Sequence, residues 1–130
     1  MKFGYTIVYV QDVNASLAFF ERAFGLARAF VSPDGEFGTL ATGDTSLAFC
    51  QHATALDSVG QPHVVAETSA QPLGMEIGLV TPDVAAACTR AVAAGATLLN
   101  PPQTKPWGQT VAYVRCPDGS LVELCTPMGG

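Results

Sequence analysis

Charged residues are scarce in this chain of 130 residues, and basic residues are scarcer still. Only 13% of the residues are charged, Lys and Arg together number 6, and the formal net charge is −5. Because nucleic acids are bound through clusters of positive charge, we expect no nucleic-acid partner. No apolar run has the length of a membrane-spanning helix, and the N-terminal residues lack the apolar segment of a signal peptide. We therefore expect a soluble, cytoplasmic protein with no membrane partner.

The motifs of several common chemistries are also missing. The four cysteines form no C-x-x-C pair, which argues against a zinc ribbon and a thioredoxin-like site. The sequence has no glycine-rich phosphate loop and no G-x-S-x-G motif, so nucleotide-dependent chemistry has no support and no cofactor is expected. With 48% hydrophobic residues, a chain of this length can form one domain around a core without disulfides.

What the chain does contain is an internal repeat. Asp12 and Asp83 each stand where an apolar, strand-like stretch changes to helical periodicity. Each aspartate is a predicted helix N-cap, because its side chain can accept hydrogen bonds from amides of the first turn. Gly25 and Gly95 follow at the distance of a short helix and are predicted C-terminal stops. The sequence therefore predicts two helices in equivalent places.

Strand patterns surround both predicted helices in the same order. Pro101, Pro102 and Pro106 interrupt the second half, so the strand after Gly95 is expected to be short and at a sheet edge. The other predicted strands cover 5–10, two segments within 30–40, 46–49, 76–81, 110–115 and 121–124. Each half therefore reads strand, helix, three strands.

These patterns predict an α+β fold of two tandem βαβββ modules. We expect the modules to form a curved mixed sheet around a cleft, with the helices outside, since one module alone cannot bury both its helix and its sheet. Module 1 covers about 1–52, a linker 53–73 and module 2 about 74–130. The linker contains Gly, Ser, Gln and Pro without a convincing period, so we expect a flexible lobe over the cleft. Its length would also permit the exchange of modules between two chains.

Glu123 is the residue that most needs an explanation. It stands among apolar residues in the last predicted strand, where a carboxylate needs a partner, a metal or a wet cavity. The repeat suggests Glu76 as its companion. Both acids could lie in a solvated cleft, or one could pair with Arg115 or Lys105. Alternatively they contact a cationic or hydrogen-bonding ligand, and their proximity raises the pKa of one of them.

His52 and Cys50 form a second group of candidates. In an extended strand the alternation of side chains places both on one face with Ala48. His52 could then act as a displaced metal ligand or a general base, or lie in solvent at the strand end. Cys50 could be a nucleophile activated by His52, but no third orienting group is visible and core packing is favoured. His63, in the linker, indicates no more than a loop contact.

Four aromatic residues are candidates for a binding platform. Tyr5, Phe49 and Tyr113 lie in predicted strands, where aromatic residues most often serve the core. Trp107 precedes Gly108 at the start of the closing hairpin, and there a tryptophan at the rim of a cleft offers a flat face to a planar ligand.

The chain resembles the vicinal oxygen chelate superfamily, which includes glyoxalase I, bleomycin-resistance proteins and extradiol dioxygenases. The resemblance rests on the order of elements, the helix starts at Asp12-Val13 and Asp83-Val84, and the closing D-G-x-x-V-E-L strand, and it covers about 3–127. In metal-dependent members the ligands come from the first and last strand of each half. The equivalent positions are Tyr5, Ala48, Glu76 and Glu123, and among them only Glu123 keeps the usual type.

The resemblance therefore implies the fold but argues against the usual metal, and no metal ligand is assigned. Trp107-Gly108 and Tyr113 resemble the arrangement in the metal-free bleomycin-resistance proteins, and the resemblance also implies a homodimer. We expect a protein that binds a small, partly aromatic molecule or antibiotic, as in drug sequestration and antibiotic resistance. The alternative is a divalent-metal-dependent lyase or isomerase of the glyoxalase type, and the sequence leaves open whether the chain is an enzyme. The predicted ligand-binding cleft comprises Tyr5, Phe49, Cys50, His52, Glu76, Trp107, Tyr113 and Glu123.

Overall fold

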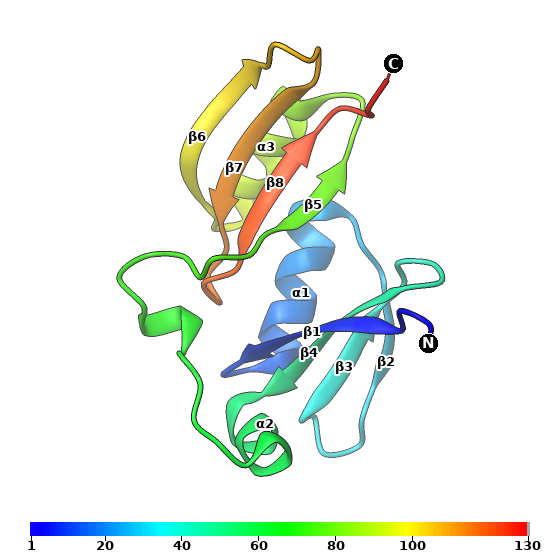
Figure 1. Cartoon of the computed structure of the whole chain (residues 1–130), viewed down its shortest axis with the longest axis vertical. Coiled ribbons are helices and arrows are strands. Elements are labelled where there is room, and N and C mark those ends of the chain that lie inside the picture. Colours follow the sequence, from blue (N-terminus) through cyan, green and yellow to red (C-terminus); the bar gives the residue numbers. More distant parts are fainter. Residues whose placement is uncertain (130) are drawn as a thin grey trace.

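The structure, a computed structural model, describes residues 1–129 and contains the predicted repeat. Each module reads strand, helix, three strands, and a further helix and a short 3-10 helix lie between the modules (Figure 1). The elements in chain order are β1 (Tyr5–Val10), α1 (Val13–Phe24), β2 (Arg28–Val31), β3 (Phe37–Leu40), β4 (Ser46–Gln51), α2 (His52–Val59), η1 (Ala66–Thr68), β5 (Ile77–Val80), α3 (Val84–Ala94), β6 (Thr97–Thr104), β7 (Thr110–Arg115) and β8 (Leu121–Cys125).

The strands form two mixed sheets with equivalent topology, one in each module. Sheet A has the order β1-β4-β3-β2, and sheet B has the order β5-β8-β7-β6. In each sheet the first strand of the module pairs in parallel with the last, and the remaining pairs are antiparallel. The predicted α+β fold of two βαβββ modules is confirmed. The two sheets remain separate hydrogen-bonded ladders, with β1 and β5 at the edges of their sheets.

The caps of the repeated helices account for where α1 and α3 begin and end. The Ala15 amide donates to Asp12 Oδ1 at 3.0 Å, and the Ala86 amide donates to Asp83 Oδ1 at the same distance. At the end of α1, Gly25 adopts a left-handed conformation with φ of 71°, which a residue with a side chain adopts only at a cost. The predicted N-caps are confirmed.

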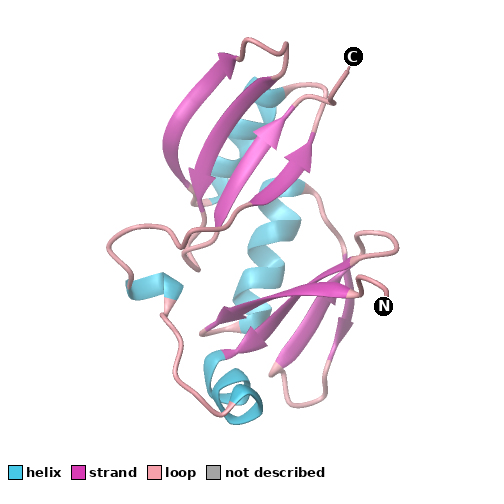
Figure 2. Ribbon diagram, in the orientation of Figure 1, coloured by secondary structure: helices cyan, strands magenta, loops and turns pink. Residues whose placement is uncertain are grey.

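One continuous core holds the two modules together. The helices α1 and α3 pack against each other behind the two sheets, as Figure 2 shows. Phe20 of α1 is fully buried against Phe49 of β4, with ring centroids 5.1 Å apart, and the same core includes Val114 and Leu124 of sheet B. Burying one such side chain contributes about 1.5 to 3 kcal/mol, so the shared core favours folding of the modules as a unit.

Polar contacts also cross between the modules. The Ser16 hydroxyl in α1 donates to Asp118 Oδ2 at 2.8 Å, and both residues are buried. Asp118 lies in the turn before β8, where its other carboxylate oxygen accepts a hydrogen bond from the Ser120 amide. On α3, Arg90 donates to the carbonyl oxygen of Arg22 at 2.7 Å, near the end of α1. The modules are therefore fixed relative to each other by directional bonds as well as by the core.

The strand after Gly95 differs from the prediction in its length. β6 extends over eight residues and includes Pro101 and Pro102, so the expected short strand is wrong, although its place at the edge of sheet B is confirmed. The pairing of β6 with β7 is irregular between Leu98 and Gln103. These irregularities let the prolines, which have no amide hydrogen, stay in the strand without interrupting a regular ladder.

The segment between the modules is more structured than its composition indicates. It contains α2, which begins at His52 rather than continuing β4, and η1. The Arg115 guanidinium donates to the carbonyl oxygens of Ala66 and Ser69, both at 2.9 Å. Arg115 therefore binds the linker backbone and does not pair with a cleft carboxylate. No helix within residues 1–129 is long and apolar enough to cross a membrane.

Candidate functional site

The face of sheet B turned away from α3 carries a group of ionisable side chains, which we call the carboxylate patch. Cross-strand pairing places Tyr113 of β7 opposite Glu123 of β8, and Glu123 opposite Gly78 of β5. Because side chains alternate along a strand, Glu123 and Cys125 share this face while Val122 and Leu124 enter the core. The patch comprises Glu76, Tyr113, Glu123 and Cys125.

Gly78 leaves open space beside Glu123. A Cβ atom placed on Gly78 would meet no other atom within 4 Å, so this part of the sheet surface is uncovered. The position directly opposite Glu123 on β5 thus has no side chain to fill the space, and a bound molecule could reach the Glu123 carboxylate from that side.

The two carboxylates are close enough to influence each other. Partial burial, a hydrogen bond with Glu123 and the charge of Glu123 together raise the pKa of Glu76. A hydrogen bond between two carboxyl groups requires a proton on one of them, because ionised carboxylates only accept. The pair can therefore hold one proton between its two groups and can also bind a positive charge.

The other two members of the patch stay protonated. Burial raises the pKa of the Tyr113 phenol, and the negative charges of Glu123 and Glu76 raise it further. Burial, Glu123 and Glu76 likewise raise the pKa of the Cys125 thiol. The patch therefore offers two carboxylates and a neutral hydroxyl, and Cys125 is not prepared to act as a nucleophile.

A pocket lies between the modules and shares Glu76 with the carboxylate patch. Its volume is about 480 Å³, within the range of pockets for small molecules. β1 contributes one wall, the linker a second, and β5 with the turn before β8 a third. The lining of this inter-module pocket consists of Ile7, Val8, Tyr9, His63, Val64, Ala66, Leu73, Met75, Glu76, Ile77, Gly119, Ser120 and Leu121. Most of these side chains are apolar, so a ligand can bury a hydrophobic body beside a carboxylate.

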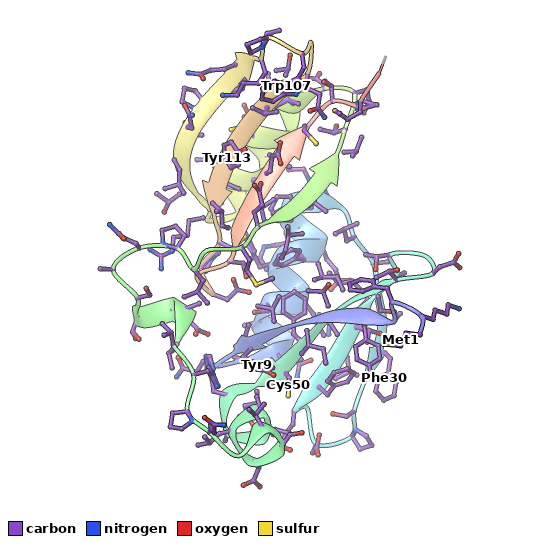
Figure 3. The ribbon with its side chains drawn as sticks, in the orientation of Figure 1. Met1, Tyr9, Phe30, Cys50, Trp107 and Tyr113 are labelled. Carbon is purple, nitrogen blue, oxygen red and sulfur yellow. The ribbon has the colours of Figure 1, made fainter. Side chains whose placement is uncertain are left out.

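The eight predicted cleft residues divide between the modules. Glu76, Tyr113 and Glu123 come together in the carboxylate patch, whereas Tyr5, 63% exposed, and Cys50 belong to sheet A of module 1. In Figure 3, Cys50 lies on the lower module and Tyr113 on the upper one. Within a single chain the predicted set is therefore not one constellation.

Phe49 and Trp107 have different surroundings from the other predicted residues. Phe49 is fully buried against Phe20 and faces α1, so it belongs to the core of module 1. Trp107 is 63% exposed in the turn between β6 and β7, where its Nε1 donates to Gln109 Oε1 at 2.8 Å. Figure 3 shows it at the far end of module 2, and it stays a predicted rim residue.

His52 does not share a strand face with Cys50, because β4 ends one residue before it. Its Nδ1 lies 2.8 Å from His63 Nε2, and its Nε2 lies 2.7 Å from Glu67 Oε1. Both ring nitrogens thus have partners other than the thiol, and burial followed by the charge of Glu36 raises the pKa of Cys50. A Cys50–His52 nucleophile has no support in this geometry.

Glu67 was not predicted, and His63 was expected to make no more than a loop contact, but both lie within hydrogen-bond distance of His52. His63 and Glu67 stand 11 and 15 residues after His52, and α2 ends at Val59 before either of them, so no single helix or strand relates the three residues. Their contact depends on how α2 and the linker fold back over β1, where the His63 ring lies 4.8 Å from the ring of Tyr9. The only available signal was that both histidines of the chain fall in one short stretch.

The donor set does not fit a tightly held divalent metal. Of the four positions where the resemblance implies metal ligands, Ala48 has no donor atom and Tyr5 is an exposed phenol on the other sheet. Within residues 1–129, no three side chains of His, Cys, Asp or Glu are grouped so as to hold one metal ion. The two remaining carboxylates are fewer than the three or four protein ligands of a typical site.

Comparison with known proteins agrees with this topology. The family model described as the Glyoxalase/Bleomycin resistance protein/Dioxygenase superfamily matches residues 2–124. A glyoxalase-related enzyme from Fulvimarina pelagi superposes with a TM-score of 0.83 at 26% identity, covering 98% of this chain and 88% of that chain. A glyoxalase/bleomycin resistance protein/dioxygenase family enzyme from Burkholderia phytofirmans PsJN superposes with a TM-score of 0.77 at 25% identity, covering 97% and 98%.

A further structure is similar in fold alone. TioX from Micromonospora sp. ML1 superposes with a TM-score of 0.68 at 23% identity, covering 97% of this chain and 98% of that chain. A search of curated proteins gave no match. The fold is that of an α+β protein built from two paired βαβββ modules. In each module the first and last strands pair in parallel. The chain belongs to the glyoxalase/bleomycin resistance protein/dioxygenase superfamily.

Proposed function

We propose that the protein binds a small, partly aromatic molecule with a positively charged group, without a tightly bound metal. The observation that carries the proposal is the carboxylate pair Glu76–Glu123 on an open sheet face, with Glu76 shared by a mostly apolar pocket. The pair attracts the charge, and the pocket accepts the hydrophobic body. Sequestration of an antibiotic or another aromatic compound is the concrete form of this function.

Two probes of nearly the same shape test the role of charge. We expect 1-methylquinolinium to bind at least about fivefold more tightly than neutral 1-methylnaphthalene, because a unit charge near two carboxylates gains roughly 1 to 4 kcal/mol. Glu123→Gln should weaken the cation about tenfold and leave the neutral probe unchanged. Asp44→Asn, which removes the same charge from an exposed loop, is the control. Titration calorimetry provides the affinities, and equal binding of both probes would contradict the proposal.

The same titration has a defined pH dependence. Because the pKa of Glu76 is raised, the pair keeps a proton to higher pH than an isolated glutamate would. As the pH rises through this raised pKa the proton leaves, the pair gains a second negative charge, and the cation binds more tightly. Affinity for 1-methylquinolinium should therefore increase with pH, and in the Glu123→Gln variant the increase should occur at lower pH.

We also propose that two copies of the chain form a homodimer. β1 and β5 each have one hydrogen-bonded neighbour, so their outer edges are free, and Val80 on β5 is 65% exposed. Val80→Lys should shift the protein from dimer to monomer in sedimentation, since lysine disfavours pairing at an exposed edge. Val59→Lys, at a residue 55% exposed on α2, is the control. A wild-type protein that sediments as a monomer at all concentrations would exclude the dimer.

A further inference from the structure

Three titratable side chains beside the inter-module pocket form a hydrogen-bonded chain. Glu67 Oε2 accepts a hydrogen bond from the Gln11 amide at 2.7 Å, and Glu67 Oε1 lies 2.7 Å from His52 Nε2. His52 Nδ1 in turn lies 2.8 Å from His63 Nε2, and the two imidazole rings, inclined at 26°, have centroids 5.1 Å apart. Each contact has the length of a good hydrogen bond.

The direction of this chain follows from which atoms can donate. An ionised Glu67 only accepts, so His52 must carry its proton on Nε2. In a neutral imidazole the other nitrogen is then an acceptor, and His52 Nδ1 requires His63 to donate from Nε2. With both imidazoles neutral, His63 Nδ1 is left as a lone pair. Glu67 thus sets the tautomers of both histidines, as a carboxylate does for a histidine in a catalytic triad.

This lone pair has no partner among residues 1–129. His63 Nδ1 is buried without a hydrogen bond, and the hydroxyl oxygen of Ser120 is the other side-chain atom in that condition. Ser120 is only 8% exposed. Buried polar atoms are nearly always hydrogen-bonded in folded proteins, and both of these residues line the same pocket. The two unpartnered atoms therefore indicate that a polar group enters the pocket.

The linker segment that contains His63 can move to accommodate such a molecule. Within the part of the chain that the structure describes, residues 61–64 make no backbone–backbone hydrogen bonds. The segment is held instead through side chains, above all through His63 against His52 and Tyr9. A small displacement of this segment therefore breaks no backbone–backbone hydrogen bond, and it lets a ligand contact the His63 imidazole.

We propose that the inter-module pocket binds a phenol, whose ring packs among the apolar lining and whose hydroxyl donates to His63 Nδ1. The Ser120 hydroxyl supplies a second hydrogen bond within the same pocket. The acceptor at His63 selects a molecule with an O–H donor, because a methyl ether of the same shape leaves the lone pair unpaired. This inference rests on the proposed function, since Glu76 belongs to both sites and the phenol is a second anchor for the ligand.

The affinities of 4-propylphenol and its methyl ether, 4-propylanisole, test whether the pocket prefers a ligand with an O–H donor. The wild-type protein should bind the phenol about tenfold more tightly, in line with one hydrogen bond to a buried acceptor. His63→Phe keeps a ring against Tyr9 and should reduce the ratio to about one, and His52→Phe should lower it because the tautomer of His63 is no longer set. Equal affinities in the wild-type protein, or a ratio unchanged in His63→Phe, would overturn the inference.

A second measurement uses only the wild-type protein, so it does not depend on whether a variant folds. Long-range proton–nitrogen NMR at about pH 8 reads the tautomers directly, and the chain has only 2 histidines to assign. Both rings should be protonated at Nε2, and the His63 Nδ1 resonance should move when 4-propylphenol is added. A proton on His63 Nδ1, or an unmoved resonance, would refute the phenol site. Retained 1-methylquinolinium binding in that case would show that the proposed function stands without it.

Discussion

Gly119→Ala should destabilise the protein by about 2 to 5 kcal/mol, a large fraction of the stability of a typical domain. Gly119 has φ of 88°, and a residue with a Cβ pays roughly 1 to 2 kcal/mol to adopt this conformation. A Cβ at this position would also overlap the backbone carbonyl of Ala66 in η1, and overpacking of this kind adds about 1 to 3 kcal/mol. The closing turn and the linker must separate to make room.

Gly43→Ala is the matched control for this prediction. Gly43 has φ of 85°, and a Cβ there would meet nothing within 4 Å, so only the conformational cost of roughly 1 to 2 kcal/mol applies. The difference between the two variants in urea denaturation measures the close contact between the turn and η1. Equal losses of stability would mean that the linker does not pack on the turn as described.

The Ser16–Asp118 hydrogen bond should contribute a coupling energy of about 2 kcal/mol in a double-mutant cycle. Ser16→Ala leaves a buried carboxylate without one of its donors, and an unmet hydrogen bond to a buried charged group costs roughly 2 to 3 kcal/mol. Asp118→Ala removes the acceptor for the Ser120 amide as well. The double variant should therefore be more stable than the sum of the two single losses predicts.

An exposed pair of the same chemistry provides the comparison. The Ser32 hydroxyl donates to Asp34 Oδ1 at 2.6 Å, but this contact is exposed to solvent. Its coupling energy should be about 0.5 kcal/mol or less, because water replaces the lost partner. Denaturant titrations of the variants in both cycles measure the two coupling energies, and their difference reports how far burial strengthens the Ser16–Asp118 pair. A coupling at Ser16–Asp118 no larger than that at Ser32–Asp34 would contradict the buried contact between α1 and the turn.

The repeat made much of the fold predictable. Asp12 and Asp83 locate the starts of both helices because N-capping is a local interaction, readable from residue type and position. The pairing of Glu76 with Glu123 was also predictable, because the equivalence of the two modules relates the first and last strands. The helix caps and the internal repeat were therefore enough to predict the architecture and the two carboxylates at the centre of the candidate site.

The parts that could not be predicted depend on tertiary contacts. Phe49 is an exception: its prediction in the cleft was wrong for a local reason, because strand alternation between Ala48 and Cys50 already turns it to the opposite face, where it packs on Phe20. α2 interrupts the alternation that was expected to continue to His52. The contacts of His63 and Glu67 with His52 exist only because the linker folds back over β1.

We expect Glu76 and Glu123 to bind the charged group of a small aromatic ligand together. A crystal structure of the protein soaked with 1-methylquinolinium tests it most directly. We expect electron density for the probe against the carboxylate patch, with the cationic nitrogen next to both carboxylates and the ring directed toward the inter-module pocket. Density for the probe only at other surfaces, with both carboxylates left in solvent, would contradict it.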